Sequence, residues 1–402
     1  MAQVRDAVIV DYLRSAFSRS RPREPERDVF NSLRMDTVGG MLIKELVKRN
    51  NIKPEEVNNV ITGTALGYGE QWTFGGRLMV FLAELPITVG GRGIDRQCAS
   101  TLEASNEAAM EIMLGFSDIV ITCGIEHMTH NPMGGGGPPG AVLPNPALYG
   151  DPRYAHYGMA QSGMGETAEK LAKQEHFSRE EMDKWALRSH QLATKAIQEG
   201  FFKGEIMPIE VTLADGKKAV IETDQAIRPT TSMEGLAQLQ PAFSQDGLIT
   251  AGNSSPLNAG ATCLVWMSAE KAKQMGLKPL ARFISAGWAG VDPTLMGMGP
   301  VPASRMALKH AGLQVKDIDY WEINEAFCVV PLYAIRELGI DPNKVNIKGG
   351  ATAIGHPLGA SGNRLIGTLA RILNLQGGRY GIATACVGGG QGVSTLIERV
   401  AN

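Results

Sequence analysis

The stretch "MLIKELVKRNNIKPEEVNNVITGTA", residues 41–65, occurs again in altered form as "PASRMALKHAGLQVKDIDYWEINEA", residues 302–326. Each copy has an apolar helical pattern, a short polar break and then a run typical of a buried strand. The copies lie about 260 residues apart, much further than the 20–50 residues that separate the units of a solenoid. The repeat therefore predicts a duplicated domain.

Two more pairs of segments extend the repeat in the same order. Residues 94–114 parallel residues 353–373, and "DIVITCGIE" (118–126) parallels "YGIATACVGGG" (380–390). Strand-like runs that alternate with helical patterns predict α/β halves with right-handed crossovers and largely parallel, buried sheets. We expect strands at 6–12, 58–66, 117–125, 263–269, 319–327 and 380–389, and helices at 36–50 and 101–114.

The segment between the two halves, about residues 126–250, differs in character. It contains the turn-rich run "NPMGGGGPPGAVLPNP" (131–146) and then a strong helical pattern that opens with a capping box at Ser178. A loop of this length without structure would be unusual, so the pattern predicts an inserted subdomain. The expected organisation is an N-terminal half at 1–270, with the insertion inside it, and a C-terminal half at 278–402.

The composition excludes several classes of protein. Hydrophobic residues make up 44% of the 402 residues, which is ordinary for a globular protein. The 41 acidic and 39 basic residues nearly balance, so we expect no nucleic-acid partner. No window approaches about 18 uninterrupted apolar residues, so no membrane span is predicted.

The cysteines and the N-terminus indicate a cytoplasmic protein. An odd number of cysteines without a CxxC spacing is typical of free thiols in a reducing compartment. Arg5 and Asp6 precede any apolar run, which differs from the pattern of a signal or transit peptide. The five cysteines are Cys98, Cys123, Cys263, Cys328 and Cys386.

The duplication predicts that residues far apart in the sequence meet. Cys98 and His356 occupy matched turns, and Cys123 and Cys386 occupy matched strand ends. Cys98 precedes a helical pattern, where the helix dipole would lower its pKa. On the residues alone, Cys98 could instead be a small buried hydrophobe and His356 a core histidine. Together they form a possible nucleophile and base.

Glycine-rich runs surround two of these residues. His356 lies within "GGATAIGHPLGASG" (349–362), and Cys386 begins "CVGGGQG" (386–392). Successive amides without a Cβ can approach a ligand closely, and they suit an oxyanion hole. The alternative for each run is a tight turn without a catalytic role.

The motifs "DRQCAS", "MGETAE", "AGNSSPLNAGA", "GMGPVPA", "NEAF", "GGATAIGHPLGASG" and "CVGGGQG" together resemble the thiolase family, in the family's order and across essentially the whole chain. The resemblance implies two homologous βαβαβαβαββ halves in a five-layer α-β-α-β-α arrangement, with an inserted loop subdomain that covers the site. It also implies a homodimer or homotetramer.

The resemblance implies a role for each residue that matches a motif. Cys98 would be the acyl-accepting nucleophile, His356 the base that activates it, and Cys386 the second acid and base. Asn324, through a water molecule, would form one oxyanion hole with His356. The amides of Cys98 and Gly388 would form the other.

Further positions match the substrate channel of the family. Ser255 and Phe243 would line the path of the CoA pantetheine, and Met164 and Phe327 the acyl pocket. The implied substrates are acyl-CoA and CoA, with no prosthetic group and no metal. The implied reaction is ping-pong cleavage of 3-ketoacyl-CoA by CoA in fatty-acid β-oxidation, with a hydratase/dehydrogenase subunit as a possible partner.

The chain departs from the family's pattern at several positions. Gly163 precedes Met164 where acetoacetyl-specific biosynthetic members have His, which favours a degradative enzyme for longer chains. Ala259 replaces an Asp, which affects loop hydrogen bonding, and "CASTLEA" replaces the common "CASGMQA" with no clear consequence. His127 and His130 could hold a metal, but packing within a loop is the favoured interpretation.

Three alternatives remain at this stage. The first is a biosynthetic acetoacetyl-CoA thiolase that condenses two acetyl-CoA molecules. The second is a ketoacyl-synthase-like condensing enzyme, which Cys386 disfavours because those enzymes use a Cys-His-His set. The third is a non-catalytic, thiolase-like lipid-binding protein, which the presence of all three reactive residues disfavours.

Overall fold

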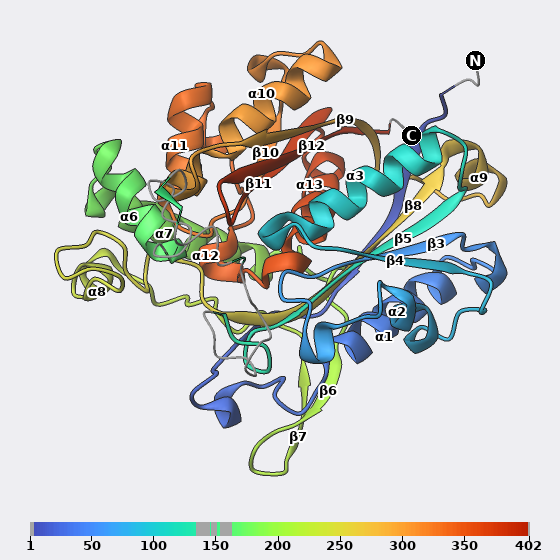
Figure 1. Ribbon diagram of the computed structural model, residues 1–402, viewed down its shortest axis with the longest axis horizontal. Coiled ribbons are helices and arrows are strands. Elements are labelled where there is room, and N and C mark those ends of the chain that lie inside the picture. The colour runs from blue at the N-terminus through green and yellow to red at the C-terminus, as the bar shows by residue number, and fades with distance from the viewer. Residues whose placement is uncertain (1–3, 134–144, 146–150, 153–162, 401–402) are drawn as a thin grey trace.

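The structure is a computed structural model that describes residues 4–133, 145, 151–152 and 163–400. Within these residues, ten strands form one mixed sheet with the order β10-β11-β12-β9-β1-β8-β5-β3-β4, and β2 pairs with β8 at its side (Figure 1). The strands of this sheet are β1 (Ala7–Arg14), β2 (Ser18–Arg19), β3 (Asn59–Gly63), β4 (Gly90–Ile94), β5 (Ile119–His127), β8 (Asn258–Ser268), β9 (Ala281–Gly290), β10 (Tyr320–Ile323), β11 (Tyr380–Val387) and β12 (Gln391–Arg399).

The two halves of this sheet have the same topology. In the first half β3 and β5 are parallel, whereas β8 is antiparallel to both β5 and β1. In the second half β10 and β11 are parallel, whereas β12 is antiparallel to both β11 and β9. Val345 bridges Trp321 in parallel, at the place that β4 takes beside β3. The halves join where β1 pairs with β9.

This topology corrects one expectation. The sheet is mixed rather than largely parallel, because the last strand of each half runs back against its neighbours. The second half shows the cause: β11 and β12 are joined by the short turn 388–390, and a tight turn can join only antiparallel strands. The first half keeps the same pairing although a long insertion separates β5 from β8.

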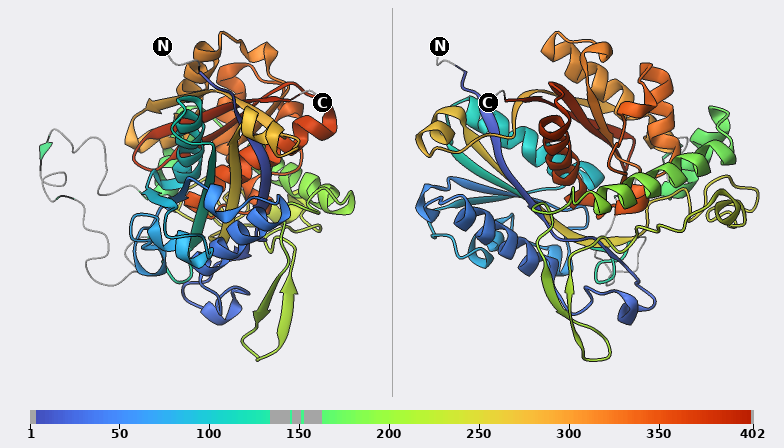
Figure 2. Two further views of the ribbon diagram at one scale, coloured as in Figure 1. Left: turned by 90° about the vertical axis from the view of Figure 1, so that its right-hand side faces the viewer. Right: turned by 180° about the vertical axis from the view of Figure 1, so that it is seen from behind.

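Helices cover both faces of each half, which gives five layers (Figures 1 and 2). α1 (Met35–Arg49) and α2 (Arg77–Leu82) cover the outer face of the first half. α10 (Pro300–Ala311) and α11 (Val329–Leu338) cover the outer face of the second half. α3 (Ser100–Met113) and α13 (Ser361–Gln376) form the middle layer and share one buried core. The duplicated five-layer fold is therefore confirmed.

The two middle helices meet closely at their N-terminal ends. A Cβ placed on Gly362 would lie 2.1 Å from the backbone nitrogen of Leu102, so only glycine allows this contact. The hydroxyl of Thr101 donates to the carbonyl of Gly359 at 2.6 Å. As a result, the short 3-10 turns η4 (Gln97–Ala99) and η8 (Leu358–Ala360), which precede the two helices, lie against each other.

The insertion has secondary structure of its own, as predicted. It contains α6 (Met164–Gln174), α7 (Arg179–Gln198), the hairpin of β6 (Ile209–Thr212) and β7 (Lys218–Ile221), and α8 (Met233–Ala237). The capping box at Ser178 is confirmed, since its side chain accepts from the Glu181 amide. α7 packs on the short helix α12 (Ala351–Ile354), just before His356. Most of the turn-rich run 131–146 lies outside the described residues.

The remaining helix, α9 (Ala269–Gln274), follows β8 at the end of the first half. No helix of the described residues is long and apolar enough to cross a membrane.

Candidate active site

One cavity of about 510 Å³ brings most of the predicted residues together. Its wall includes Cys98 and the N-terminal end of α6 from the first half, and His356 and Cys386 from the second. The other predicted residues along it are Met164, Phe243, Ser255, Phe327 and Gly388. Asn324 is not part of this wall, but its side chain contacts the ring of His356.

Cys98 lies in the η4 turn, directly before α3. Gln97 beside it has φ of +47°, a left-handed conformation that is unusual for a residue with a side chain. Desolvation by the surrounding protein raises the pKa of the Cys98 thiol to about 12, although the amides of Gly388 and of Cys98 itself donate to the sulfur. The prediction of a lowered pKa was wrong, because desolvation outweighs the helix dipole here.

His356 is buried, and both its backbone amide and its imidazole ring have hydrogen-bond partners. Its amide donates to Asn258 Oδ1 at 2.7 Å, and its ring Nδ1 lies 2.6 Å from Ser361 Oγ. Asn324 Nδ2 lies 3.3 Å from Nε2 and 3.4 Å from Nδ1. Burial, and secondarily the positive charge of Arg364, lowers the pKa of His356 to about 3, so the imidazole is neutral.

Cys386 is buried near the C-terminal end of β11. Burial, and next the proximity of Cys98, raises its thiol pKa far above the ordinary value. The cavity therefore contains two thiols and one imidazole that are all uncharged at neutral pH. A proton that passes from a neutral thiol to the neutral imidazole creates an ion pair, so the transfer must accompany the formation of the new bond.

Cys123 does not correspond to Cys386, contrary to the sequence prediction. It lies within β5 opposite Cys263, and it packs against Gly39 of α1 in the outer core. The strand registers match Ile125, not Cys123, with Cys386, since Asn59 pairs with Val120 as Tyr320 pairs with Gly381. The error came from a slip of two residues in the repeat.

Asn324 directly follows β10 and is fully buried. Its amide donates to the Thr384 carbonyl at 2.9 Å, which continues the pairing between β10 and β11. Its Oδ1 has no hydrogen-bond partner among the described residues. The side chain thus has hydrogen-bonding capacity left beside the imidazole.

Glu126 is a buried residue of the site that the sequence analysis missed. It ends the apolar run of β5 and accepts from the amides of Ala65 and Gly359 at 2.8 and 2.9 Å. Gly359 belongs to the η8 turn, so this carboxyl ties the first half to the turn after His356. Burial raises its pKa to about 7. An acidic residue at the end of an otherwise apolar strand was the available signal.

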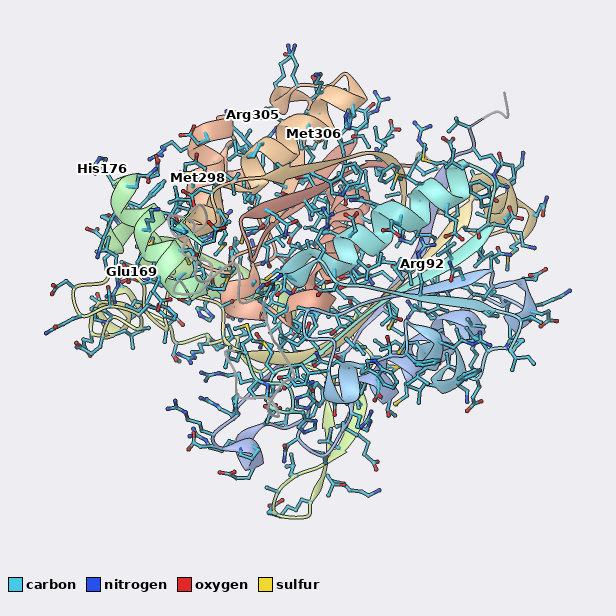
Figure 3. The ribbon with its side chains drawn as sticks, viewed as in Figure 1. Arg92, Glu169, His176, Met298, Arg305 and Met306 are labelled. Carbon is cyan, nitrogen blue, oxygen red and sulfur yellow. The ribbon has the colours of Figure 1, made fainter. Side chains whose placement is uncertain are left out.

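The outer part of the cavity is apolar and comes largely from the insertion. Phe243 and Phe327 pack edge to face with centroids 5.9 Å apart. A Cβ on Gly165 would overlap the Phe243 ring, so glycine at this position lets the ring lie across the start of α6. Glu169 of α6, which is labelled in Figure 3, accepts from the amides of Leu248 and Ile249 at 2.8 Å each. These two bonds fix the segment that follows Phe243.

Ser255 lies at the edge of this apolar region. Its amide and its hydroxyl both donate to the carbonyl of Ala326, at 3.0 and 3.1 Å. This residue therefore connects the end of the insertion to the "NEAF" segment of the second half.

A second cavity, of about 260 Å³, adjoins the first and shares Ser254 and Pro256 with it. Arg19 and Arg228 lie in its wall with several hydroxyl groups. Partial burial and the neighbouring arginines lower the pKa of Arg19 to about 10. The two cations are close enough to disfavour each other, and an anion in this cavity would relieve that repulsion.

His127 and His130 stack on each other beside Glu70, with ring centroids 3.6 Å apart. His127 contacts the Phe30 carbonyl and the His130 amide, and His130 contacts Glu70 and Asn31. Both nitrogens of each ring thus have protein partners. Glu70, His127 and His130 each offer one ligand atom, and these atoms lie within 4.8 Å of one another, so the interpretation as loop packing stays a prediction. The sequence spacing did not reveal Glu70 as a neighbour.

Comparison with known proteins identifies relatives over the whole chain. The family profile of the thiolase N-terminal domain matches residues 7–270, and that of the thiolase C-terminal domain matches residues 277–399. A 3-ketoacyl-CoA thiolase of Marinobacter nauticus is 42% identical over 401 residues, 98% of this chain and 99% of its own. One from Hahella chejuensis has the same identity and coverage. The crystal structure of the Bacillus anthracis acetyl-CoA acetyltransferase, 37% identical, superposes with a TM-score of 0.85 over 100% of both chains.

Proposed function

This chain belongs to the thiolase family of acyltransferases, and we propose that it cleaves 3-ketoacyl-CoA with CoA to give acetyl-CoA and an acyl-CoA two carbons shorter. The observation that carries the proposal is the single cavity onto which Cys98, His356 and Cys386 open. A hydrolase would need one thiol and one base. A second thiol is useful where a carbanion must be protonated and an incoming thiol deprotonated.

In the first step, Cys98 attacks the 3-keto carbon of the substrate. Its proton passes to Nε2 of His356 while the sulfur–carbon bond forms and negative charge develops on the keto oxygen. The amides of Cys98 and Gly388 both donate to the sulfur, so an oxygen on the carbon that bonds to this sulfur would lie close to both donors. One preorganised donor of this kind contributes about 2.7–4 kcal/mol to the transition state.

In the second step, the bond between the second and third carbons breaks. Its electron pair moves to the acetyl fragment, whose thioester oxygen takes up the charge. His356, now carrying the proton, would donate to this oxygen directly, and Asn324, which lies beside the imidazole, would do so through a water molecule. Cys386 gives its proton to the carbanion, and acetyl-CoA leaves. General acid catalysis of this kind contributes about 10²–10⁴-fold.

In the third step, free CoA collects the acyl group. The Cys386 thiolate takes the proton of the CoA thiol, and the CoA sulfur attacks the acyl group on Cys98. The Cys98 thiolate that leaves takes its proton back from His356. All protons and bonds are then restored, and the kinetics are ping-pong with an acyl-Cys98 intermediate.

The lining of the cavity favours substrates with longer chains. Four methionines, Met128, Met133, Met164 and Met296, surround the reactive groups and present unbranched, adaptable side chains. A Cβ on Gly163 would lie 2.5 Å from Glu166 Oε2, and both residues line the cavity. The volume falls within the range of about 300–1,000 Å³ that is usual for ligand sites. We therefore favour a degradative enzyme of fatty-acid β-oxidation.

A biosynthetic acetoacetyl-CoA thiolase is the second candidate. The superposition on an acetyl-CoA acetyltransferase over the full chain supports it, since this fold also occurs in that enzyme. The Claisen condensation uses the same three residues in reverse, so the catalytic geometry alone is compatible with either direction.

CoA is proposed as substrate rather than as a resident group. The apolar channel past Phe243 and Ser255 suits its pantetheine arm, and the adjoining cavity with Arg19 and Arg228 suits its phosphates. Arg19 and Arg228 have no ion-pair partner among the described residues, and attraction of these anions to their guanidinium groups would orient the thioester toward Cys98.

The edge of the sheet supports self-association. β4 is the edge strand of the sheet in the first half and carries the unpaired backbone groups of an edge. Phe74, Phe81 and Ile87 are exposed in the segment that leads to it. We propose a homodimer through this edge, or a homotetramer built from it. A hydratase/dehydrogenase partner remains a prediction, as does cytoplasmic location, which the five free thiols support.

Initial rates of thiolysis with 3-ketoacyl-CoA of four to sixteen carbons test the proposal. We expect kcat/KM for chains of eight or more carbons to exceed that for four carbons by at least about tenfold, because each buried methylene contributes about 0.8 kcal/mol. Activity confined to acetoacetyl-CoA would favour the biosynthetic candidate. No thiolysis of any chain length would contradict the function itself.

A further inference from the structure

Ser361 makes the shortest side-chain contact to the proposed catalytic base. Its Oγ lies 2.6 Å from Nδ1 of His356, and both residues are at least 97% buried. Ser361 is also the first residue of α13, a helix of 16 residues that packs in the middle layer. The hydroxyl is therefore attached to a rigid element rather than to a free loop.

The contact with Ser361 and the proposed role of the base together define which nitrogen carries the proton. Asn324 Nδ2 lies 3.3 Å from Nε2 and 3.4 Å from Nδ1, so it does not distinguish the two nitrogens. Ser361 contacts Nδ1, which leaves Nε2 as the nitrogen whose lone pair takes the proton of Cys98 in the proposed mechanism. The proton of a neutral imidazole must then be on Nδ1, where it is donated to Ser361 Oγ. The hydroxyl can accept this bond, because a serine oxygen has two lone pairs.

Ser361 gives the His356 ring an uncharged hydroxyl as its hydrogen-bond partner. A carboxylate at the same position would be a negatively charged partner instead. A carboxylate would also fix the Nδ1–H tautomer, but it would stabilise the imidazolium and retain the proton taken from Cys98. A neutral acceptor fixes the tautomer and leaves the ring weakly basic, so the proton returns readily when the acyl group leaves. The only charged side chain that acts on the His356 ring among the described residues is Arg364, which also disfavours the imidazolium.

We propose that Ser361 is a positioning residue for the thiolase reaction: it accepts a hydrogen bond from Nδ1–H of His356 and thereby presents the Nε2 lone pair to Cys98. This inference rests on the proposed function of His356 as the base. Ser361 lies within the motif "GGATAIGHPLGASG" but is not one of the residues proposed to react. The residue acts through the imidazole and does not touch the substrate.

Nitrogen-15 NMR of histidine-labelled protein tests the tautomer directly. We expect the His356 signal, assigned by its loss in His356→Gln, to show a protonated Nδ1 and an unprotonated Nε2 in the unsubstituted protein at neutral pH. In Ser361→Ala the Nε2–H form should become populated, whereas Ser361→Thr should keep the original tautomer because it retains the hydroxyl. An Nε2–H tautomer in the unsubstituted protein would overturn the proposal even if no variant folds.

Kinetics give a second readout. Ser361→Ala should lower kcat about tenfold with little change in KM, as expected for loss of one buried hydrogen bond, and Ser361→Thr should recover most of it. Ser285→Ala is a matched control, since this buried hydroxyl bonds only the Ala307 carbonyl far from the cavity. Unchanged tautomer and kcat in Ser361→Ala would contradict the positioning role. Absence of thiolysis in the unsubstituted protein would instead contradict the proposed function. The NMR experiment would still show which nitrogen of His356 carries the proton.

Discussion

The two halves have a matching turn. In the first half this turn carries Cys98, and in the second half it follows His356 by one residue. Each is a single 3-10 turn that leads into a middle-layer helix whose first residue is a buried serine, Ser100 or Ser361. The backbone differs between the two turns. Gln97, the first residue of the first turn, is left-handed, whereas Leu358, the first residue of the second turn, has no positive φ. The second half has a positive φ of +121° at Gly355 instead, directly before His356.

The serines show how the same scaffold came to have two chemistries. Ser100 bonds only backbone groups, those of Thr64, Arg96 and Gln97, and so holds the turn that presents the thiol. Ser361 bonds the imidazole instead. The matched position therefore stabilises a backbone in one half and orients a side chain in the other. Duplication supplies the geometry, and single residues determine which half provides the nucleophile and which the base.

The largest expected effect comes from removing the thiol of the first turn. Cys98→Ser should reduce thiolysis on the order of 10⁴-fold or more, as loss of a nucleophile does in other enzymes. The measurement is kcat with a substrate that the unsubstituted enzyme cleaves. Cys123→Ser is the control: its sulfur lies in the outer core, so activity should remain. Equal loss in both variants would show that folding, not chemistry, was lost.

The next effect tests the thiol at the end of β11. Cys386→Ala should lower kcat by about 10²–10⁴-fold, the usual contribution of a general acid and base. The protein should still react with iodoacetamide at Cys98, which peptide mass spectrometry can measure. Full activity of Cys386→Ala would mean that water or another group carries the proton, and the proposed role would be wrong.

The contact between the two middle helices should affect stability. Gly362→Ala places a methyl group against the Leu102 backbone and should destabilise the fold by about 1–3 kcal/mol, as overpacking of a core does. Denaturant unfolding measures this loss. Gly290→Ala at the end of β9 is the control, because a Cβ there would meet nothing within 4 Å. Equal stability of the two variants would contradict the close approach of the halves.

The smallest effect concerns pH. The Cys98 pKa of about 12 and the His356 pKa of about 3 mean that neither group changes its main charge state between pH 6 and 9. The small thiolate fraction of Cys98 should therefore rise about tenfold per pH unit over this range, and its alkylation rate with it. Site-resolved alkylation kinetics provide the test. A plateau near neutral pH would indicate a preformed thiolate–imidazolium pair instead.

The sequence predicted the parts of the fold that have strong local patterns. The strand expected at 319–327 contains β10, and that expected at 380–389 contains β11. β4 was not predicted, since "GGRGI" is rich in glycine and half exposed at an edge. β12 was missed although it follows β11 by a short turn, because only one strand was expected in that run.

The sequence predicted the site less well where burial determines the pKa of a side chain. The helix that follows Cys98 can be predicted from its residues, but the desolvation that raises the thiol pKa depends on tertiary packing, and the Gly388 amide that opposes this rise comes from a distant segment. Glu126 was overlooked because its hydrogen-bond partners belong to two other loops. Motif order placed the reactive residues, and tertiary packing determines their protonation.

Mass spectrometry of the protein after incubation with acetyl-CoA is the most direct test of the central claim. The account predicts one acetyl group on the peptide that contains Cys98, none on those with Cys123, Cys263, Cys328 or Cys386, and full removal when free CoA is added. An unmodified Cys98, or a stable acetyl group on a different cysteine that CoA does not remove, would contradict it.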